Sequence, residues 1–368
     1  MSRTAYILGA GFSHYAGLPL QSDFTKELLA ARDYGSGPSR AMVGFLDRFI
    51  HDVFDHSKQA DAKYWPELED VFTCIDLAAN TGHHLGSLYS PARLRTVRRV
   101  LIARIMRMLH HKYSSAAKRQ TPDLKRLFHF VESVDPENAT FISLNWDVSL
   151  ESVCLDRKKS CGISYGHGIN AASFPDSGQV IESEKESGDP LFKITKMHGS
   201  INWLYCDCCR RVFWFHPSEV THIADQILSK EEWREIRPDT AAKPRWECAR
   251  CSGVVLGTRI ATFSYRKALD FRMFQISWFR AEAALRQCSR WVFVGYSLPG
   301  ADYEFKQLLK RVELSKRTRP TIFAVTGGSP EAVDKARLNY RRFFGRSIEV
   351  GKTFFSEGLS KSVVSQIV

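Results

Sequence analysis

The sequence predicts an α/β fold built on a doubly wound, mostly parallel β-sheet. Short apolar runs recur along the chain, and each of them ends in a glycine or polar turn. Amphipathic stretches with apolar residues at three- and four-residue spacing lie between the runs, as expected for helices that cover both faces of such a sheet. Two Cys-x-x-C pairs within one segment indicate a small metal-binding module in addition.

The strands are predicted from apolar runs that are too short for helices. The first run, Thr4–Leu8, leads directly into Gly9-Ala10-Gly11. Helix patterns accompany the later runs, which is the strand–turn–helix repeat of a parallel sheet. The other predicted strands are Thr140–Leu144, Phe192–Met197, Trp291–Val294 and Thr321–Val325, and the helices near the last two are Asp270–Gln287, Asp302–Val312 and Ser329–Phe344.

Long helical patterns predict an insertion, residues 31–130, between the first and second strands. Its clearest apolar stripe runs from Leu94 to Met108, and a loop is expected at residues 33–40, which read DYGSGPSR. Four arginines fall largely on other faces of the same helix: Arg95, Arg98, Arg99 and Arg107. They predict a solvated or subunit-contacting surface, with contact to nucleic acid or an acidic partner as the less favoured alternative.

The cysteines predict a closed metal site of four thiolates. Cys206 with Cys209, and Cys248 with Cys251, have the spacing of ligands for a structural, tetrahedral zinc ion. The gap between the pairs is longer than in a common ribbon, and Cys208 is a spare thiol or a competing ligand. These boundaries predict a zinc-ribbon module at 201–257 and a nucleotide-binding domain made of residues 1–30, 131–200 and 258–368, with an exposed loop at 173–189.

Composition limits the partners and the cellular location that can be expected for the protein. The chain has 368 residues and a formal charge of +12, which is compatible with nucleic acid, an acidic partner or a polyanionic cofactor, although spread charges favour a solvated basic surface. We find no signal-peptide pattern and no run of about 18 apolar residues, so no membrane association is expected. Nine cysteines without a disulfide pattern suit a reducing, cytoplasmic location.

Polar turns after the strands are the candidate site, because ligands of open α/β sheets bind at the carboxyl ends of the strands. The glycine turn, Gly9–Ser13, follows a strand and opens a helix, as in dinucleotide-binding turns. His14 stands where the usual fingerprint has its third glycine, so the turn is not that of an ordinary dehydrogenase. The other turns are the Asn145 turn (Asn145–Asp147), the His198 turn (His198–Ser200) and the Gly295 turn (Gly295–Ser297).

These turns together resemble the motifs of the sirtuin family. The string GAGFSHYAGLP, from Gly9, resembles the first sirtuin motif, and the other three turns resemble the later ones in the family's order, with the cysteine module in the family's place. The resemblance covers nearly the whole chain. It implies a sirtuin-like Rossmann domain that takes NAD as its substrate and carries a structural zinc ion.

The resemblance also implies a role for each residue. Gly9, Ala10, Gly11 and Ser13 would bind pyrophosphate, Gly295 and Ser297 would contact phosphate or ribose, and Thr326 would lie at the adenosine end. Asn145 would hold a ribose hydroxyl or the attacking water, since an amide both donates and accepts, and His198 would act as general base. Asp147 would orient the nicotinamide amide or, alternatively, brace its loop.

Departures from the deacylase motifs favour another branch of the family. The arginine that follows the first motif in deacylases is missing, Leu144 replaces their glutamine, and residues 262–267 lack their Phe-Gly-Glu strand. The KMHGSINW string from Lys196 and the Gly295 region resemble bacterial antiphage-defence members instead. We therefore expect NAD hydrolysis to ADP-ribose and nicotinamide that depletes NAD, with a lysine deacylase or a non-catalytic NAD or ADP-ribose sensor as alternatives. A homo-oligomer is expected, and a separate activator, such as an ATPase or a nucleic-acid-guided protein, is plausible.

Overall fold

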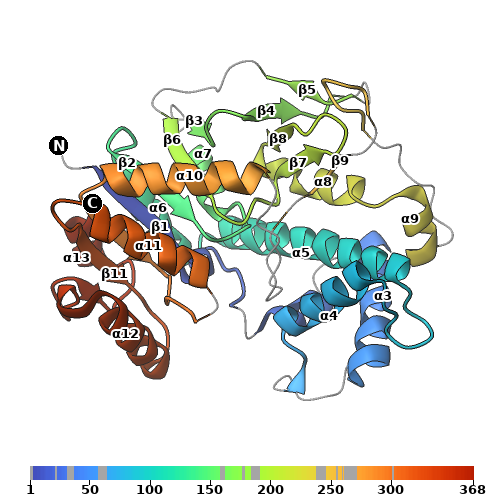
Figure 1. Cartoon of the computed structure of the whole chain (residues 1–368), viewed down its shortest axis with the longest axis horizontal. Coiled ribbons are helices and arrows are strands. Elements are labelled where there is room, and N and C mark those ends of the chain that lie inside the picture. The colour runs from blue at the N-terminus through green and yellow to red at the C-terminus, as the bar shows by residue number, and fades with distance from the viewer. Residues whose placement is uncertain are drawn as a thin grey trace.

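The chain folds into a large parallel sheet covered by helices, a smaller second sheet, and a group of helices beside the latter (Figure 1). The computed structural model describes residues 3–20, 23–30, 37–56, 64–157, 162–175, 179–183, 191–237, 246–253, 256–258, 260, 272–300 and 302–368. Within these residues, no helix is long and apolar enough to cross a membrane.

The large sheet confirms the predicted fold class. Its seven strands lie in the order β12-β11-β10-β1-β2-β6-β3, and every pairing between them is parallel. β1 and β11 have the predicted bounds, whereas β3 and β12 were not predicted because three and two residues are too few for a periodic pattern. The strands are β1 Thr4–Leu8, β2 Ala139–Ser143, β3 Gly162–Ser164, β6 Leu191–Lys196, β10 Arg290–Val294, β11 Thr321–Val325 and β12 Phe354–Phe355.

The strand order reverses at β1, which makes the switch point of the sheet. From β1 the chain builds the sheet first on the β2 side and later on the β10 side. The register brings the carboxyl ends level, with Leu8 opposite both Ser143 and Val294, and Ser143 opposite Lys196. The turns that follow these strands therefore meet at one edge, which is where open α/β sheets bind ligands.

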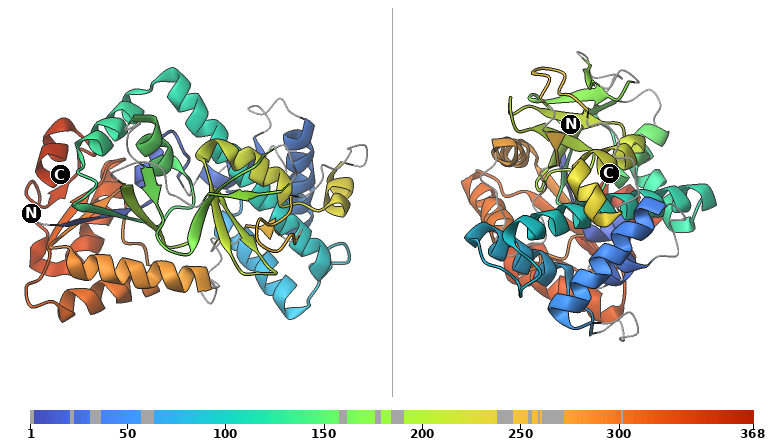
Figure 2. Two further views of the ribbon diagram at one scale, coloured as in Figure 1. Left: turned by 90° about the horizontal axis from the view of Figure 1, so that it is seen from above. Right: turned by 90° about the vertical axis from the view of Figure 1, so that its right-hand side faces the viewer.

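Alternate residues of β1 face the two helical layers. The ring of Tyr6 packs against Phe130 of α6, and its hydroxyl donates to the carbonyl of Ile367 in α13. Ala5 and Ile7 face the opposite layer, where α10, α11 and α12 lie (Figure 2, left). The helices that flank this sheet are α1 Ala10–His14, α6 Pro122–Ser133, α7 Ser149–Arg157, α10 Arg272–Gln287, α11 Tyr303–Ser315, α12 Pro330–Phe344 and α13 Lys361–Ile367, and the 3₁₀ turn η4 Gly345–Ser347 follows α12.

Four helices, α2 to α5, extend from the large sheet, and α3 to α5 lie within the residues predicted as the helical insertion. Its longest helix begins with Pro91 after the capping Ser90, whose hydroxyl accepts from the Arg93 amide, and runs for 29 residues. The loop expected at 33–40 is wrong for residues 37–40, because α3 begins at Gly37 and Pro38 is tolerated in the first turn of a helix. Residues 33–36 lie outside the described residues. The bounds are α2 Phe24–Leu29, α3 Gly37–Phe54, α4 Leu68–Thr81 and α5 Pro91–Arg119.

The second sheet combines strands from before and after the His198 turn. Its order is β5-β4-β8-β7-β9, and β4 pairs in parallel with β8. The exposed loop expected at 173–189 is wrong at Ile181–Glu182, which pair with β4, because that pairing depends on a partner strand and not on local pattern. Its elements are β4 Ile169–Ser173, β5 Ile181–Glu182, β7 Trp203–Cys206, β8 Val212–Phe215, β9 Leu256–Gly257, η3 Pro217–Glu219, α8 Val220–Gln226 and α9 Lys230–Ile236.

The arginines of α5 hold neighbouring parts of this chain together. Arg98 pairs with Asp76 of α4 at 2.7 Å, Arg107 pairs with Asp225 of α8, and Arg99 pairs with Glu232 of α9. Arg95 donates to the carbonyl of Ala79. The expectation of a solvated or subunit-contacting face is therefore wrong for Arg98 and Arg107, which pair with carboxylates of other segments. Arg95 is exposed, as expected, and the Arg99 side chain is 42% exposed although it is paired.

Candidate active site

The glycine turn and the Gly295 turn pack backbone against backbone at the switch point. The Gly9 amide donates to the Val294 carbonyl at 3.1 Å, and the Gly11 amide donates to the Gly295 carbonyl at 2.8 Å. Gly295 has a φ of +61°, and a Cβ there would lie 2.1 Å from the Phe12 nitrogen. Only glycine fits this position, because any side chain would strike the neighbouring backbone.

This packing accounts for part of the glycine pattern without a ligand. The Gly11 amide already donates to a protein carbonyl, and α1 has only five residues. The roles of Gly9, Ala10 and Gly11 toward a pyrophosphate therefore remain predictions.

A directed chain of hydrogen bonds joins the Asn145 turn to the glycine turn. The Asn145 Nδ2 donates to the Gly9 carbonyl at 2.8 Å and to the Ser13 Oγ at 2.9 Å. The Ser13 hydroxyl then donates to the Asp147 Oδ2 at 2.6 Å. Ser13 is buried, so its side chain lies between Asn145 and Asp147 and aligns the two.

The partners of Asn145 determine which way its amide faces. A backbone carbonyl can only accept, so the group that faces Gly9 must be the nitrogen. Both hydrogens of the amide are thus directed into the protein, one to Gly9 and one to Ser13. The Oδ1 atom is the group that Asn145 can offer to a ligand, and it accepts a hydrogen bond from a hydroxyl or a water.

Asp147 is held at three points. Its Oδ2 accepts from Ser13, its Oδ1 accepts from the Ser149 amide at 2.9 Å, and its backbone carbonyl accepts from the Lys196 ammonium at 2.5 Å. These contacts agree with the alternative role for Asp147, in which it braces its own loop. Contact with a nicotinamide amide remains a prediction.

His198 is oriented by the residue that precedes Asn145. Its Nδ1 lies 3.0 Å from the Leu144 carbonyl, and the ring is largely buried. Since that carbonyl only accepts, Nδ1 carries the proton, and in the neutral ring Nε2 carries the lone pair. This is the tautomer that a general base needs when its Nε2 takes a proton.

Further backbone contacts fix the His198 turn against the Asn145 turn. The Ile201 amide donates to the Trp146 carbonyl at 2.9 Å, and the Ser200 hydroxyl donates to the same carbonyl at 3.3 Å. Gly199, which lies between His198 and Ser200, has a φ of +79°, a conformation that favours glycine. The two candidate catalytic side chains therefore come from one interlocked pair of turns.

A buried ion pair lies behind these turns, and sequence reasoning missed it. The Lys196 ammonium, at the end of β6, lies 3.1 Å from the Glu151 carboxylate of α7, and both side chains are 1% exposed. Tyr165 donates to the same carboxylate at 2.9 Å. Burial, and then the Glu151 charge, raise the pKa of Tyr165 well above its usual value, so this hydroxyl stays protonated. The same strand also carries the exposed Lys193, so the sequence held no signal that set the buried lysine apart.

The remaining predicted ligand contacts lie on the β10–β11 side. The Ser297 side chain is exposed, and its carbonyl accepts from the Asn339 amide at 3.0 Å. The Thr326 amide donates to the Phe355 carbonyl at 2.9 Å, and the Thr326 carbonyl accepts from Gly358. The structure places both residues after their strands as expected, and their contacts with a nucleotide remain predictions.

A cavity of about 170 Å³ lies beside Asp147. Helix α5, the start of α7 and the segment after β8 line it, and its lining includes neither Asn145 nor His198. The Ser149 hydroxyl is buried at this cavity without a hydrogen-bond partner. A ligand at Asp147 would find an acceptor and donor there in Ser149.

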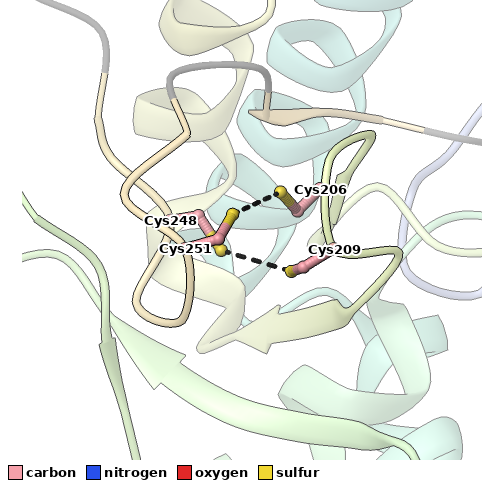
Figure 3. Close-up of side chains that lie close together, drawn as sticks. All are labelled: Cys206, Cys209, Cys248 and Cys251. Carbon is pink, nitrogen blue, oxygen red and sulfur yellow. Dashed lines mark hydrogen bonds between the residues drawn. The ribbon is translucent and has the colours of Figure 1, made fainter.

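The four predicted cysteine ligands come together on two facing loops (Figure 3). All four sulfurs lie within 4.8 Å of one another, with Cys206 Sγ 3.6 Å from Cys251 Sγ and Cys209 Sγ 3.7 Å from Cys248 Sγ. Tetrahedral bonds of about 2.3 Å to zinc place the sulfurs about 3.8 Å apart, so the cluster is compatible with a structural zinc ion. Cys208 is exposed and lies outside the cluster.

The surroundings of Cys251 and Cys206 shift the pKa values of the two thiols in opposite directions. A hydrogen bond from the backbone of Gly253 lowers the pKa of Cys251 to about 7. Burial raises the pKa of Cys206 to about 12. A metal ion supplies the positive charge that this buried thiolate needs, which is why closed thiolate sites are filled by zinc.

Comparisons with known proteins return structures only. No family model and no curated protein matches the chain. Similar solved structures include one described as "Structural Basis for the Mechanism and Regulation of Sir2 Enzymes", at 13% identity and a TM-score of 0.40 over 100% of this chain and 90% of that one. A second is "The Structural basis of Sirtuin Substrate Affinity", at 13% identity and a TM-score of 0.39 over 100% of this chain and 93% of that one. A third is "Crystal structure of a Sir2 homolog–NAD complex", at 11% identity and a TM-score of 0.39 over 100% of this chain and 88% of that one. Similarity at this level assigns no activity to this chain.

Proposed function

We propose that the protein is an enzyme that hydrolyses NAD to ADP-ribose and nicotinamide at the switch point of the large sheet. The observation that carries the proposal is the interlocked pair of turns there. It offers the Asn145 Oδ1 as an acceptor and holds His198 in the tautomer with a basic Nε2. The order of the four turns, which resembles that of the sirtuin motifs, supports NAD as the substrate.

The proposed reaction breaks the bond between nicotinamide and the ribose C1′. Nicotinamide leaves with the bonding electron pair, and a centre with oxocarbenium character forms at C1′. Asn145 Oδ1 accepts a hydrogen bond from the attacking water or from a ribose hydroxyl. His198 Nε2 takes the proton that the water loses as its oxygen bonds to C1′. The products are ADP-ribose, nicotinamide and one proton.

Sequence features favour water over an acyl-lysine as the nucleophile. Leu144 stands where deacylases carry a glutamine, and the arginine of their first motif is missing. The placing of the nicotinamide amide at Asp147 rests on the resemblance, since the cavity beside Asp147 is lined by neither Asn145 nor His198. The cysteine cluster would hold zinc in a purely structural role, because four protein ligands leave no position open for substrate.

We place this activity in bacterial antiphage defence by NAD depletion, in a cytoplasmic homo-oligomer. The KMHGSINW string and the Gly295 region, which resemble such proteins, support this setting. An enzyme that drains NAD must be restrained, so a separate activating protein, such as an ATPase or a nucleic-acid-guided protein, belongs to the proposal.

The test is chromatography of NAD after incubation with the purified protein and no acylated peptide. We expect nicotinamide and ADP-ribose in equal amounts. Loss of a general base lowers turnover by about 10²- to 10⁴-fold, so His198→Ala is expected to be almost inactive, and Asn145→Ala strongly reduced. Matched controls are His84→Ala and Asn80→Ala, which remove the same side-chain types from exposed positions of the helical insertion.

Other outcomes would redirect the assignment. Release of nicotinamide only in the presence of an acyl-lysine peptide would identify a deacylase. NAD that binds and stays intact in both conditions would identify a sensor. Equal loss of turnover in the His84→Ala control would show that the assay reports general damage to the protein.

A further inference from the structure

We infer that Lys196, through its ion pair with Glu151, is a positioning residue that keeps the Asn145 turn and the His198 turn in the geometry for NAD cleavage. This inference rests on the proposed function and adds residues to it. Lys196 lies two residues before His198, and its ammonium donates to the carbonyl of Asp147, two residues after Asn145, at 2.5 Å. The Lys196 side chain thus connects the end of β6, which leads into the His198 turn, to the Asn145 turn.

The burial of this pair argues against a role in stability alone. Both side chains are 1% exposed, and each charge loses most of its hydration on folding. Such a loss generally offsets the attraction between the two charges, and apolar residues of similar volume often stabilise a core as well or better. A buried pair beside a candidate site therefore calls for a function that an apolar pair could not perform.

Glu151 is itself fixed by a buried network that reaches the second sheet. Tyr165 donates to its Oε1 at 2.9 Å. The Asn202 amide donates to the Tyr165 hydroxyl at 3.3 Å and to the Phe215 carbonyl of β8 at 2.7 Å. The Lys196 ammonium and the Tyr165 hydroxyl both meet the Glu151 Oε1, whereas its Oε2 is buried without a hydrogen-bond partner. Oε1 is therefore the atom that anchors Lys196, and Tyr165 and Asn202 hold it in place.

Hydrogen bonds link Lys196, through Asp147 and Ser13, to the candidate catalytic residue Asn145. Asp147 receives the Lys196 ammonium on its carbonyl and the Ser13 hydroxyl on its carboxylate. Ser13 in turn accepts from the Asn145 amide. Displacement of the Asp147 backbone would therefore move the Asn145 Oδ1, and displacements of about 1 Å at reacting groups lower rates by about 100-fold.

The experiment compares Lys196→Met, Glu151→Gln and the double variant Lys196→Met/Glu151→Leu with Lys193→Met, an exposed lysine on the same strand. Melting temperature, kcat and KM for NAD are measured for each. Lys196→Met leaves a buried carboxylate without its counter-charge, so its melting temperature should fall clearly. The double variant should recover most of that loss while its kcat stays about 10- to 100-fold below the wild type, with KM nearly unchanged.

Glu151→Gln should keep more turnover than the double variant, because its amide oxygen can still accept from Lys196 and Tyr165. A double variant that is as stable and as active as the wild type would overturn the inference, and the pair would then be structural. If the double variant does not fold, Lys196→Met decides: assayed well below its own melting temperature, a wild-type kcat would equally overturn the inference. If the wild-type protein never cleaves NAD, the proposed function is overturned and the inference falls with it. The wild-type assay alone shows this, before any variant is measured.

Discussion

At the scale of single residues, the candidate site is built from short, directional contacts between backbone turns. The carbonyl of Gly9 orients the Asn145 amide, and the carbonyl of Leu144 orients the His198 ring. In both cases a group that can only accept selects which atom faces the ligand side. The chemistry of the site therefore depends on backbone geometry as much as on the catalytic side chains.

Gly295 provides a test of this dependence. Gly295→Ala places a methyl group 2.1 Å from the Phe12 nitrogen in a left-handed backbone, so we expect a loss of more than about 3 kcal/mol in the free energy of unfolding. The matched control is Gly82→Ala, which also has a left-handed backbone (φ +79°, ψ +11°) but no atom within 4 Å of the added methyl. It should lose only about 1–2 kcal/mol, the conformational part. Denaturant unfolding of both variants measures the difference, and equal losses would contradict the close approach of the two turns.

At the scale of elements, helix α5 connects the insertion to the segment that carries the cysteines. Its basic residues pair with Asp225, Glu232 and Glu235 of α8 and α9, on the face of α5 turned toward that segment. Its apolar residues are buried against α3 and α4 (Figure 1). An arginine-rich helix thus serves as an internal connector, although its composition is equally typical of a surface that binds nucleic acid.

The Arg107–Asp225 pair is the contact of this kind to test. Its side chains are 13% and 14% exposed, so a double-mutant cycle with alanine should give a coupling energy of about 1.5–3 kcal/mol. The exposed pair Arg126–Asp123, at 53% and 60%, should give less than about 1 kcal/mol in the same cycle. Thermal unfolding of the single and double variants supplies the energies. A coupling at Arg107 no larger than that at Arg126 would show that α8 is held to α5 by apolar contacts alone.

At the scale of the whole molecule, the second sheet with its cysteine cluster lies beside both the large sheet and the helical insertion (Figure 1). Strand β7 follows the His198 turn directly and ends in Cys206. Asn202, just before β7, bonds to Tyr165 and so joins this sheet to the network behind the site. Loss of order in the cysteine loops would therefore reach residues next to His198.

Metal removal tests this arrangement. We expect one zinc ion per chain by elemental analysis, and its loss in Cys248→Ser should lower the melting temperature by about 10 °C or more, since each kcal/mol shifts it by about 2–4 °C in a domain of this kind. Cys208→Ser removes an exposed thiol outside the cluster and should leave both the zinc content and the melting temperature unchanged. Zinc loss in Cys208→Ser would mean that this cysteine, and not one of the four, is a ligand.

Local signals in the sequence were sufficient for five strands of the large sheet, for the turns that follow them and for the cysteine pairs. β1 and β11 have their predicted bounds, and Asn145 and His198 follow neighbouring strands as expected. Apolar runs, glycine turns and Cys-x-x-C spacing each reflect interactions within a few residues, so they can be read from one chain.

Contacts between distant residues were decided only by the tertiary structure. Three sets of contacts join segments far apart in the chain: the hydrogen bond from the Gly11 amide to the Gly295 carbonyl, the ion pairs of α5, and the buried pair of Lys196 with Glu151. Periodicity describes which face of an element is buried, but it does not state which partner covers that face. The same sequence pattern therefore leaves a buried lysine or an internal arginine indistinguishable from a solvated one until the fold brings its counter-charge beside it.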